Sequence, residues 1–70
     1  KSKKLTTEDM MLIADMDEEA TTVLDNIWDS SRDFAKACQV LLKMGKVNNT
    51  SLAGKWVIAY WHMKEDAENE

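Results

Sequence analysis

A single histidine and a single cysteine are the side chains of this 70-residue chain best suited to chemistry. His62 has no second histidine or cysteine at the spacing of zinc ligands, so we expect no zinc site within one chain. Cys38 lies far from His62 in the sequence, and no local pattern joins them as a nucleophile and its base. Cys38 instead falls on an apolar stripe, where a cysteine acts as a small core residue.

The acidic side chains offer one further candidate. Asp15, Asp17 and Glu19 alternate as the first ligands of a calcium loop do. That loop needs a glycine at its sixth position for a sharp turn, and this chain has Ala20 there. The sequence also has no glycine-rich phosphate loop. We therefore predict no metal, no cofactor and no enzymatic activity.

Length and composition indicate one small folded domain over residues 1–70. The chain is 44% hydrophobic with three tryptophans, which is too apolar for a disordered segment. The lone cysteine favours a reducing compartment, and no apolar run is long enough to cross a membrane. We expect a cytoplasmic protein with no membrane contact, whose segments 1–5 and 66–70 are frayed.

The spacing of apolar residues predicts an all-α fold, a compact bundle of three or four short helices. Apolar and small residues recur in steps of three and four from Ala20 to Leu41, as on one side of a helix. The first helix is expected to start after Thr6, the second to cover about 17–29, and the last to run from Leu52 to about Asp66. A strand over 56–61 is the alternative for the last segment, but no partner strand is evident.

Cap residues predict where the helices begin and end. Thr6 can cap the first helix, and Asp15 and Ser30 stand where the second and third could restart. The third helix should turn Phe34 inward and end at Gly45, which suits the left-handed residue after a helix.

The last helix carries apolar residues on two opposite sides. One side forms a normal core stripe, while Gly54, Val57, Ile58 and Trp61 lie on the other. A tryptophan in such a place is a frequent anchor of protein interfaces. We predict that this second side binds another protein or forms a homodimer, so that the chain is a non-enzymatic interaction or regulatory module. The alternative is that the first helix covers Ile58 and Trp61.

Charge is divided between the two halves of the chain. Residues 8–33 contain nine acidic side chains and one arginine, whereas residues 34–64 contain five lysines and no acid. The halves can pair with each other, or the acidic half can bind a basic protein surface. The third possibility is that the basic half binds nucleic acid.

The nucleic-acid hypothesis is a helix-turn-helix regulator that uses Lys43, Lys46, Asn49 and Lys55. It is the less favoured one, because the net charge is −4. In addition, no arginine lies in this region to recognise guanine.

Overall fold

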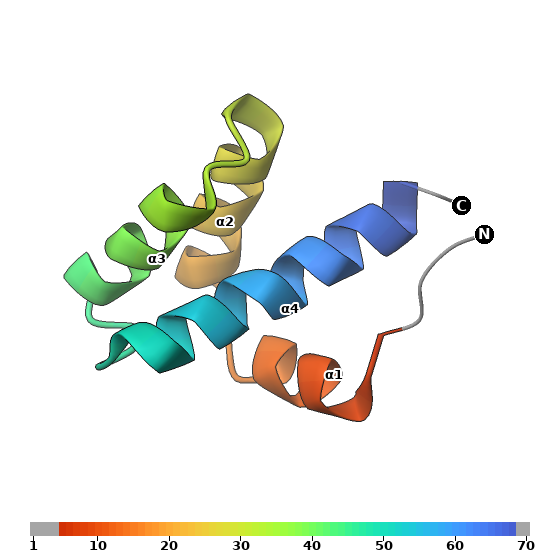
Figure 1. Cartoon of the computed structure of the whole chain (residues 1–70), viewed down its shortest axis with the longest axis horizontal. Helices are drawn as coiled ribbons and strands as arrows, with labels where there is room; N and C mark the ends of the chain where they lie inside the picture. Colours follow the sequence, from red (N-terminus) through yellow and green to blue (C-terminus); the bar gives the residue numbers. More distant parts are fainter. Residues whose placement is uncertain (1–4, 69–70) are drawn as a thin grey trace.

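The computed structural model describes residues 5–68 and contains four α-helices there. They are α1 (Thr7–Ala14), α2 (Glu18–Ser30), α3 (Phe34–Lys43) and α4 (Thr50–Glu68). Figure 1 shows α4 crossing the middle of the molecule, with α1 on one side and α2 and α3 on the other. The predicted all-α bundle is therefore confirmed. Of the segments predicted to fray, 1–4 and 69–70 lie outside the described residues.

The hydrophobic core forms where α2, α3 and α4 meet. Leu24 of α2, Leu41 of α3 and Val57 of α4 are the largest fully buried side chains. Helix α4 supplies more of the core than any other helix, through Ala53, Trp56, Val57, Ala59 and Tyr60. Helix α1 has no fully buried residue, and it packs on α4 through the half-buried Leu12. The last helix is thus the centre of the fold.

The start of α1 is confirmed, and α2 begins close to its predicted start near residue 17, but the predicted cap of α2, Asp15, is wrong. The Thr6 hydroxyl accepts a hydrogen bond from the Asp9 amide at 3.0 Å, as a capping box requires. At α2 the cap is Asp17, whose carboxylate accepts from the Ala20 amide at 2.9 Å. Asp15 instead closes α1, because its own amide donates to carbonyl groups of the last turn.

The predicted start of α3 is also wrong. Helix α2 continues through Ser30, and Asp33 caps α3 by accepting from the Lys36 amide at 3.1 Å. The Ser30 hydroxyl is not available as a cap, since it bonds back to the Ile27 carbonyl within α2. Between the helices Arg32 adopts a left-handed backbone with φ of 54°, which lets the chain reverse.

Gly45 ends α3 as predicted. Its φ is +78°, and the Lys46 amide donates to the Leu41 carbonyl at 3.0 Å, which is the bond of a Schellman motif. After this turn Asn49 caps α4 by accepting from the Leu52 amide at 2.7 Å. At its far end α4 reaches Glu68, beyond the predicted end near Asp66.

The two glycines provide a matched test of this geometry. Gly45→Ala should lower the free energy of unfolding by about 1 kcal/mol, because a Cβ strains the left-handed backbone although it meets no atom within 4 Å. Gly54→Ala should raise it by up to about 1 kcal/mol, because alanine is the better residue inside a helix. Its Cβ would meet only Phe34 at 3.9 Å. Urea denaturation of both variants tests this, and equal effects would contradict it.

Candidate protein-interaction face

Helix α4 is apolar on most of its sides, and the other three helices cover only part of it. Helices α1, α2 and α3 all pack against it. One strip between α1 and α3 stays open, and there Ile58 is 43% exposed. Phe34, the first residue of α3, stands beside this strip and is 41% exposed. Two large apolar side chains therefore face water next to each other.

The open strip forms a shallow hollow of about 240 Å³. It is lined by Phe34, Ile58, Trp61, His62 and Glu65. Gly54 belongs to the same surface, because a Cβ placed there would lie 3.9 Å from the Phe34 ring. The lining is apolar in the middle, with His62 and Glu65 as its polar members.

A second hollow of about 400 Å³ adjoins the first along α3. Its lining residues are Phe34, Ala35, Cys38, Gln39, Leu42 and Thr50. Phe34 lines both hollows, so they form one continuous surface. We call this surface the α3–α4 face and define it by its apolar members and Gly54: Phe34, Ala35, Cys38, Leu42, Gly54, Ile58 and Trp61.

The four residues predicted to bind a partner do not all lie on the same surface. Gly54, Ile58 and Trp61 lie on the α3–α4 face, but Val57 is fully buried. Including Val57 in the exposed side was wrong, because it belongs to the core cluster formed with α2 and α3. Phe34 was missed, since its apolar character suggested an inward position. Its place at the first position of a helix, directly after a cap, is the signal that could have indicated exposure.

Trp61 is half-buried, and α2 provides the ring that covers it. The rings of Trp28 and Trp61 meet edge to face, with centroids 5.2 Å apart and planes at 68°. The Arg32 guanidinium lies over the Trp28 ring, 4.0 Å from its centroid. The alternative prediction was that the first helix covers Ile58 and Trp61. Helix α1 lies beside Ile58 but leaves it 43% exposed, and Trp61 packs against Trp28 of α2.

The end of α4 is held against the same aromatic pair. A Glu68 carboxylate oxygen accepts from the Trp28 indole nitrogen at 3.0 Å and from Arg32 at 3.1 Å. These bonds explain why the helix continues through Glu68. They also fix the side of α4 that Trp61 presents to the α3–α4 face.

His62 links α4 to α1. Its Nδ1 lies 3.2 Å from an Asp9 carboxylate oxygen. Burial raises the pKa of Asp9, but hydrogen bonds with His62 and with the Thr6 amide outweigh it, so the pKa lies below its ordinary value. His62 is therefore engaged in holding the two helices together.

The polar contacts around Tyr60 have a structural role. Tyr60 lies against Asp25, and burial together with this hydrogen bond raises its pKa to about 12. Lys64 completes the group with an ion pair to Asp25 at 2.8 Å. Burial also raises the pKa of Cys38, so its thiol is protonated at neutral pH and is a poor nucleophile.

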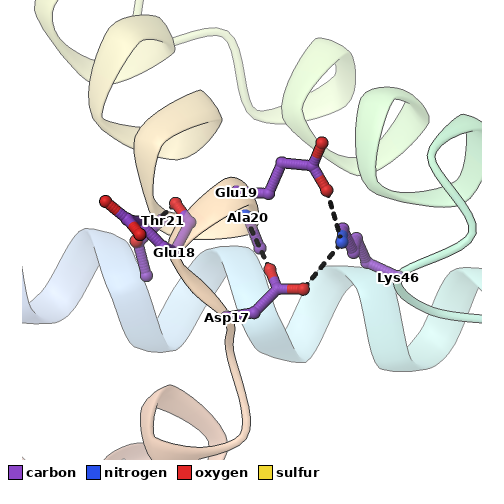
Figure 2. A network of polar contacts seen from close by, with 6 residues as sticks. All are labelled: Asp17, Glu18, Glu19, Ala20, Thr21 and Lys46. Atoms are coloured by element: carbon purple, nitrogen blue, oxygen red, sulfur yellow. Dashed lines mark hydrogen bonds and ion pairs between the residues drawn. The ribbon is translucent and has the colours of Figure 1, made fainter.

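The four residues of the nucleic-acid hypothesis do not form one free basic surface. Lys46 donates to Asp17 at 2.7 Å and to Glu19 at 2.8 Å, as Figure 2 shows. Asn49 is used as the cap of α4. Lys43 is exposed at the end of α3, and Lys55 is exposed on α4. Two of the four side chains are thus engaged within the chain.

The prediction that the acidic and basic halves pair with each other is confirmed at two lysines. Lys46 joins the turn after α3 to the start of α2, and Lys64 joins α4 to Asp25 of α2. The hydrogen bond from Lys46, followed by the one from the Ala20 amide, lowers the pKa of Asp17 below its ordinary 3.8.

This pKa shift predicts how the stabilisation by Lys46 depends on pH. Unfolded Asp17 titrates near 3.8, so the contribution is complete above that pH and is lost as the pH falls through the lower folded value. Lys46→Gln should lower the Tm at pH 7, and its difference from the unmodified chain should shrink below pH 3.8. Lys43→Gln is the control and should change the Tm little. A constant difference between pH 7 and pH 2.5 would contradict the pairing.

Comparison with protein-family models, curated proteins and solved structures finds no match to this chain. The site is therefore defined by its own geometry. In the part of the chain that the structure describes, no helix is long and apolar enough to span a membrane. Within residues 5–68, no three His, Cys, Asp or Glu side chains gather as metal ligands would.

Proposed function

We propose that the chain is a non-enzymatic protein-interaction module that binds an apolar helix of another polypeptide chain through the α3–α4 face. The observation that carries this proposal is the exposure of Phe34 and Ile58 side by side in the lining of one hollow. Fully burying an apolar side chain of this size contributes about 1.5–3 kcal/mol, so both residues gain from being covered. Exposed apolar patches of this kind mark interaction sites.

The shape of the face favours a protein over a small molecule. A small-molecule pocket encloses most of the surface of its ligand. Here the hollows lie on the outside of two neighbouring helices, and their shared wall is the exposed Phe34 ring. An elongated apolar surface between two helices suits an amphipathic helix, which would place residues of every third or fourth position against it.

The chemistry of the face argues against catalysis. Its polar neighbours are Gln39, Thr50, His62 and Glu65. His62 is bound to Asp9, and the Cys38 thiol is kept protonated by burial. No nucleophile therefore stands beside a base on this face. A cytoplasmic location, expected from the single cysteine, is part of the same proposal.

A library of displayed helical peptides tests the proposal without a known partner. Peptides selected on the immobilised chain should show apolar residues at helical spacing. They should bind Ile58→Glu at least tenfold more weakly, since a charge in the middle of the face would be desolvated. Met11→Glu is the matched control, because Met11 is 65% exposed on α1 and does not line either hollow of the face.

Circular dichroism should show the same helix content in both variants. Selected peptides that bind Ile58→Glu and the unmodified chain equally would contradict the proposed face. A failure to select any binding peptide would contradict the proposed function itself.

A further inference from the structure

We infer that α1 is an autoinhibitory cover of α4, which leaves α4 as a unit when a partner helix binds the α3–α4 face. This inference rests on the proposed function and names a regulation of the same site. Its basis is that α1 is attached to one helix alone. Among the helices within residues 5–68, α1 packs against α4 only, whereas α2, α3 and α4 all pack against one another. Undocking of α1 therefore breaks no contact between the other three helices.

The attachment of α1 combines one half-buried apolar side chain with one polar pair. Leu12 packs against the core cluster, while Met10 and Met11 are 51% and 65% exposed. The polar pair is the contact between His62 and Asp9 at 3.2 Å. An isolated helix of eight residues is not stable in water, so α1 unfolds when it leaves α4. We call the chain with α1 undocked and the other three helices in place the open form.

The connection after α1 lets this opening stop before α2. Met16 packs against the core cluster, and the Asp17 carboxylate caps α2 by accepting from the Ala20 amide. Lys46 in the turn after α3 donates to the same Asp17 carboxylate at 2.7 Å (Figure 2). The start of α2 is thus held by α2 itself and by the turn after α3, without a contribution from α1.

Docked α1 places charge at the border of the apolar face. Ile58 lines the shallow hollow of the α3–α4 face and also a hollow toward α1, whose other lining residues are Glu8, Asp9, Leu12 and Lys55. A partner helix that covers Ile58 completely comes against the carboxylates of Glu8 and Asp9, and removing a carboxylate from water is unfavourable. Undocking of α1 carries both carboxylates away from Ile58. An apolar partner helix and α1 therefore compete for α4.

Native-state hydrogen exchange of the full chain, followed by NMR, tests whether α1 opens by itself. The amides of α1 should exchange faster than those of Leu24 and Leu41 in the core. Gly45→Ala destabilises the end of α3 and should speed exchange at Leu41 about fivefold. It should leave exchange in α1 unchanged, because α3 stays in place in the open form. Equal acceleration of α1 and Leu41 would mean that α1 opens only with the whole fold, and would overturn the inference.

Leu12→Ala shifts the chain toward the open form, and Met11→Ala is its matched control. Both variants introduce alanine, which is the best helix former, so neither weakens α1 as a helix. Leu12→Ala removes the contact with the core cluster, and the α1 amides should exchange about tenfold faster. Met11 is 65% exposed, so Met11→Ala should change this exchange by less than about twofold.

Helical peptides selected on the unmodified chain test the competition. They should bind Leu12→Ala up to about tenfold more tightly, because a larger fraction of this variant is already in the open form. A saturating peptide should also speed the exchange of the α1 amides. A helix α1 that only supports α4 predicts the opposite. Equal or weaker binding by Leu12→Ala, or slower exchange in α1 after the peptide is added, would overturn the inference.

The outcomes separate this inference from the proposed function. A chain that binds selected peptides through Ile58 while α1 stays docked overturns the autoinhibitory cover and leaves the proposed function standing. A chain for which no binding peptide can be selected overturns both, whatever the exchange of α1.

Discussion

A helix that is apolar on nearly every side is unstable in water until other elements cover it, and α4 imposes this requirement on the whole chain. Helices α2 and α3 meet its core side, where Val57 is fully buried. Helix α1 contributes no fully buried residue of its own, yet it covers a further side of α4. Three short helices do not surround a central one completely, and the strip with Ile58 is what they leave open. The candidate site therefore lies on the part of α4 that the other three helices do not cover.

Polar contacts at the edges of α4 determine how the covering helices are placed. His62 pairs with Asp9 of α1, and Lys64 pairs with Asp25 of α2. Such contacts between partly exposed groups add little to the free energy of unfolding. They instead fix the position of each covering helix on α4, because apolar contacts alone are not directional. Acidic residues of the first half and lysines of the second half of the sequence therefore pair with each other within the chain.

The local signals in the sequence predicted much of the fold, because caps and turns depend on neighbouring residues alone. Thr6 and Gly45 act as predicted. Asp15 and Ser30 do not cap the following helices, because each completes the preceding one instead. Two polar residues close together in the sequence can both suit a cap, and only the packing of the helix decides which one is used.

Only part of the candidate site was predicted from the sequence, and the reason differs from the one that holds for the caps. The period of a helix shows that Gly54, Ile58 and Trp61 share a side. It does not show which residues at the edges of that side are covered by the neighbouring helices. Val57 stands at the border of that side and is covered by the core, whereas Phe34 of another helix joins it. Which border residues are buried depends on contacts between distant segments, which periodicity alone does not encode.

Methyl NMR with a soluble paramagnetic probe tests the central claim most directly, because Val57 and Ile58 are neighbours in α4 with opposite environments. In a dilute sample, the probe should broaden the Ile58 methyl signals strongly and leave those of Val57 nearly unchanged. This result would show that the open strip of α4 exists in solution. Equal protection of both residues in dilute solution would contradict it and would mean that α4 is covered on every side.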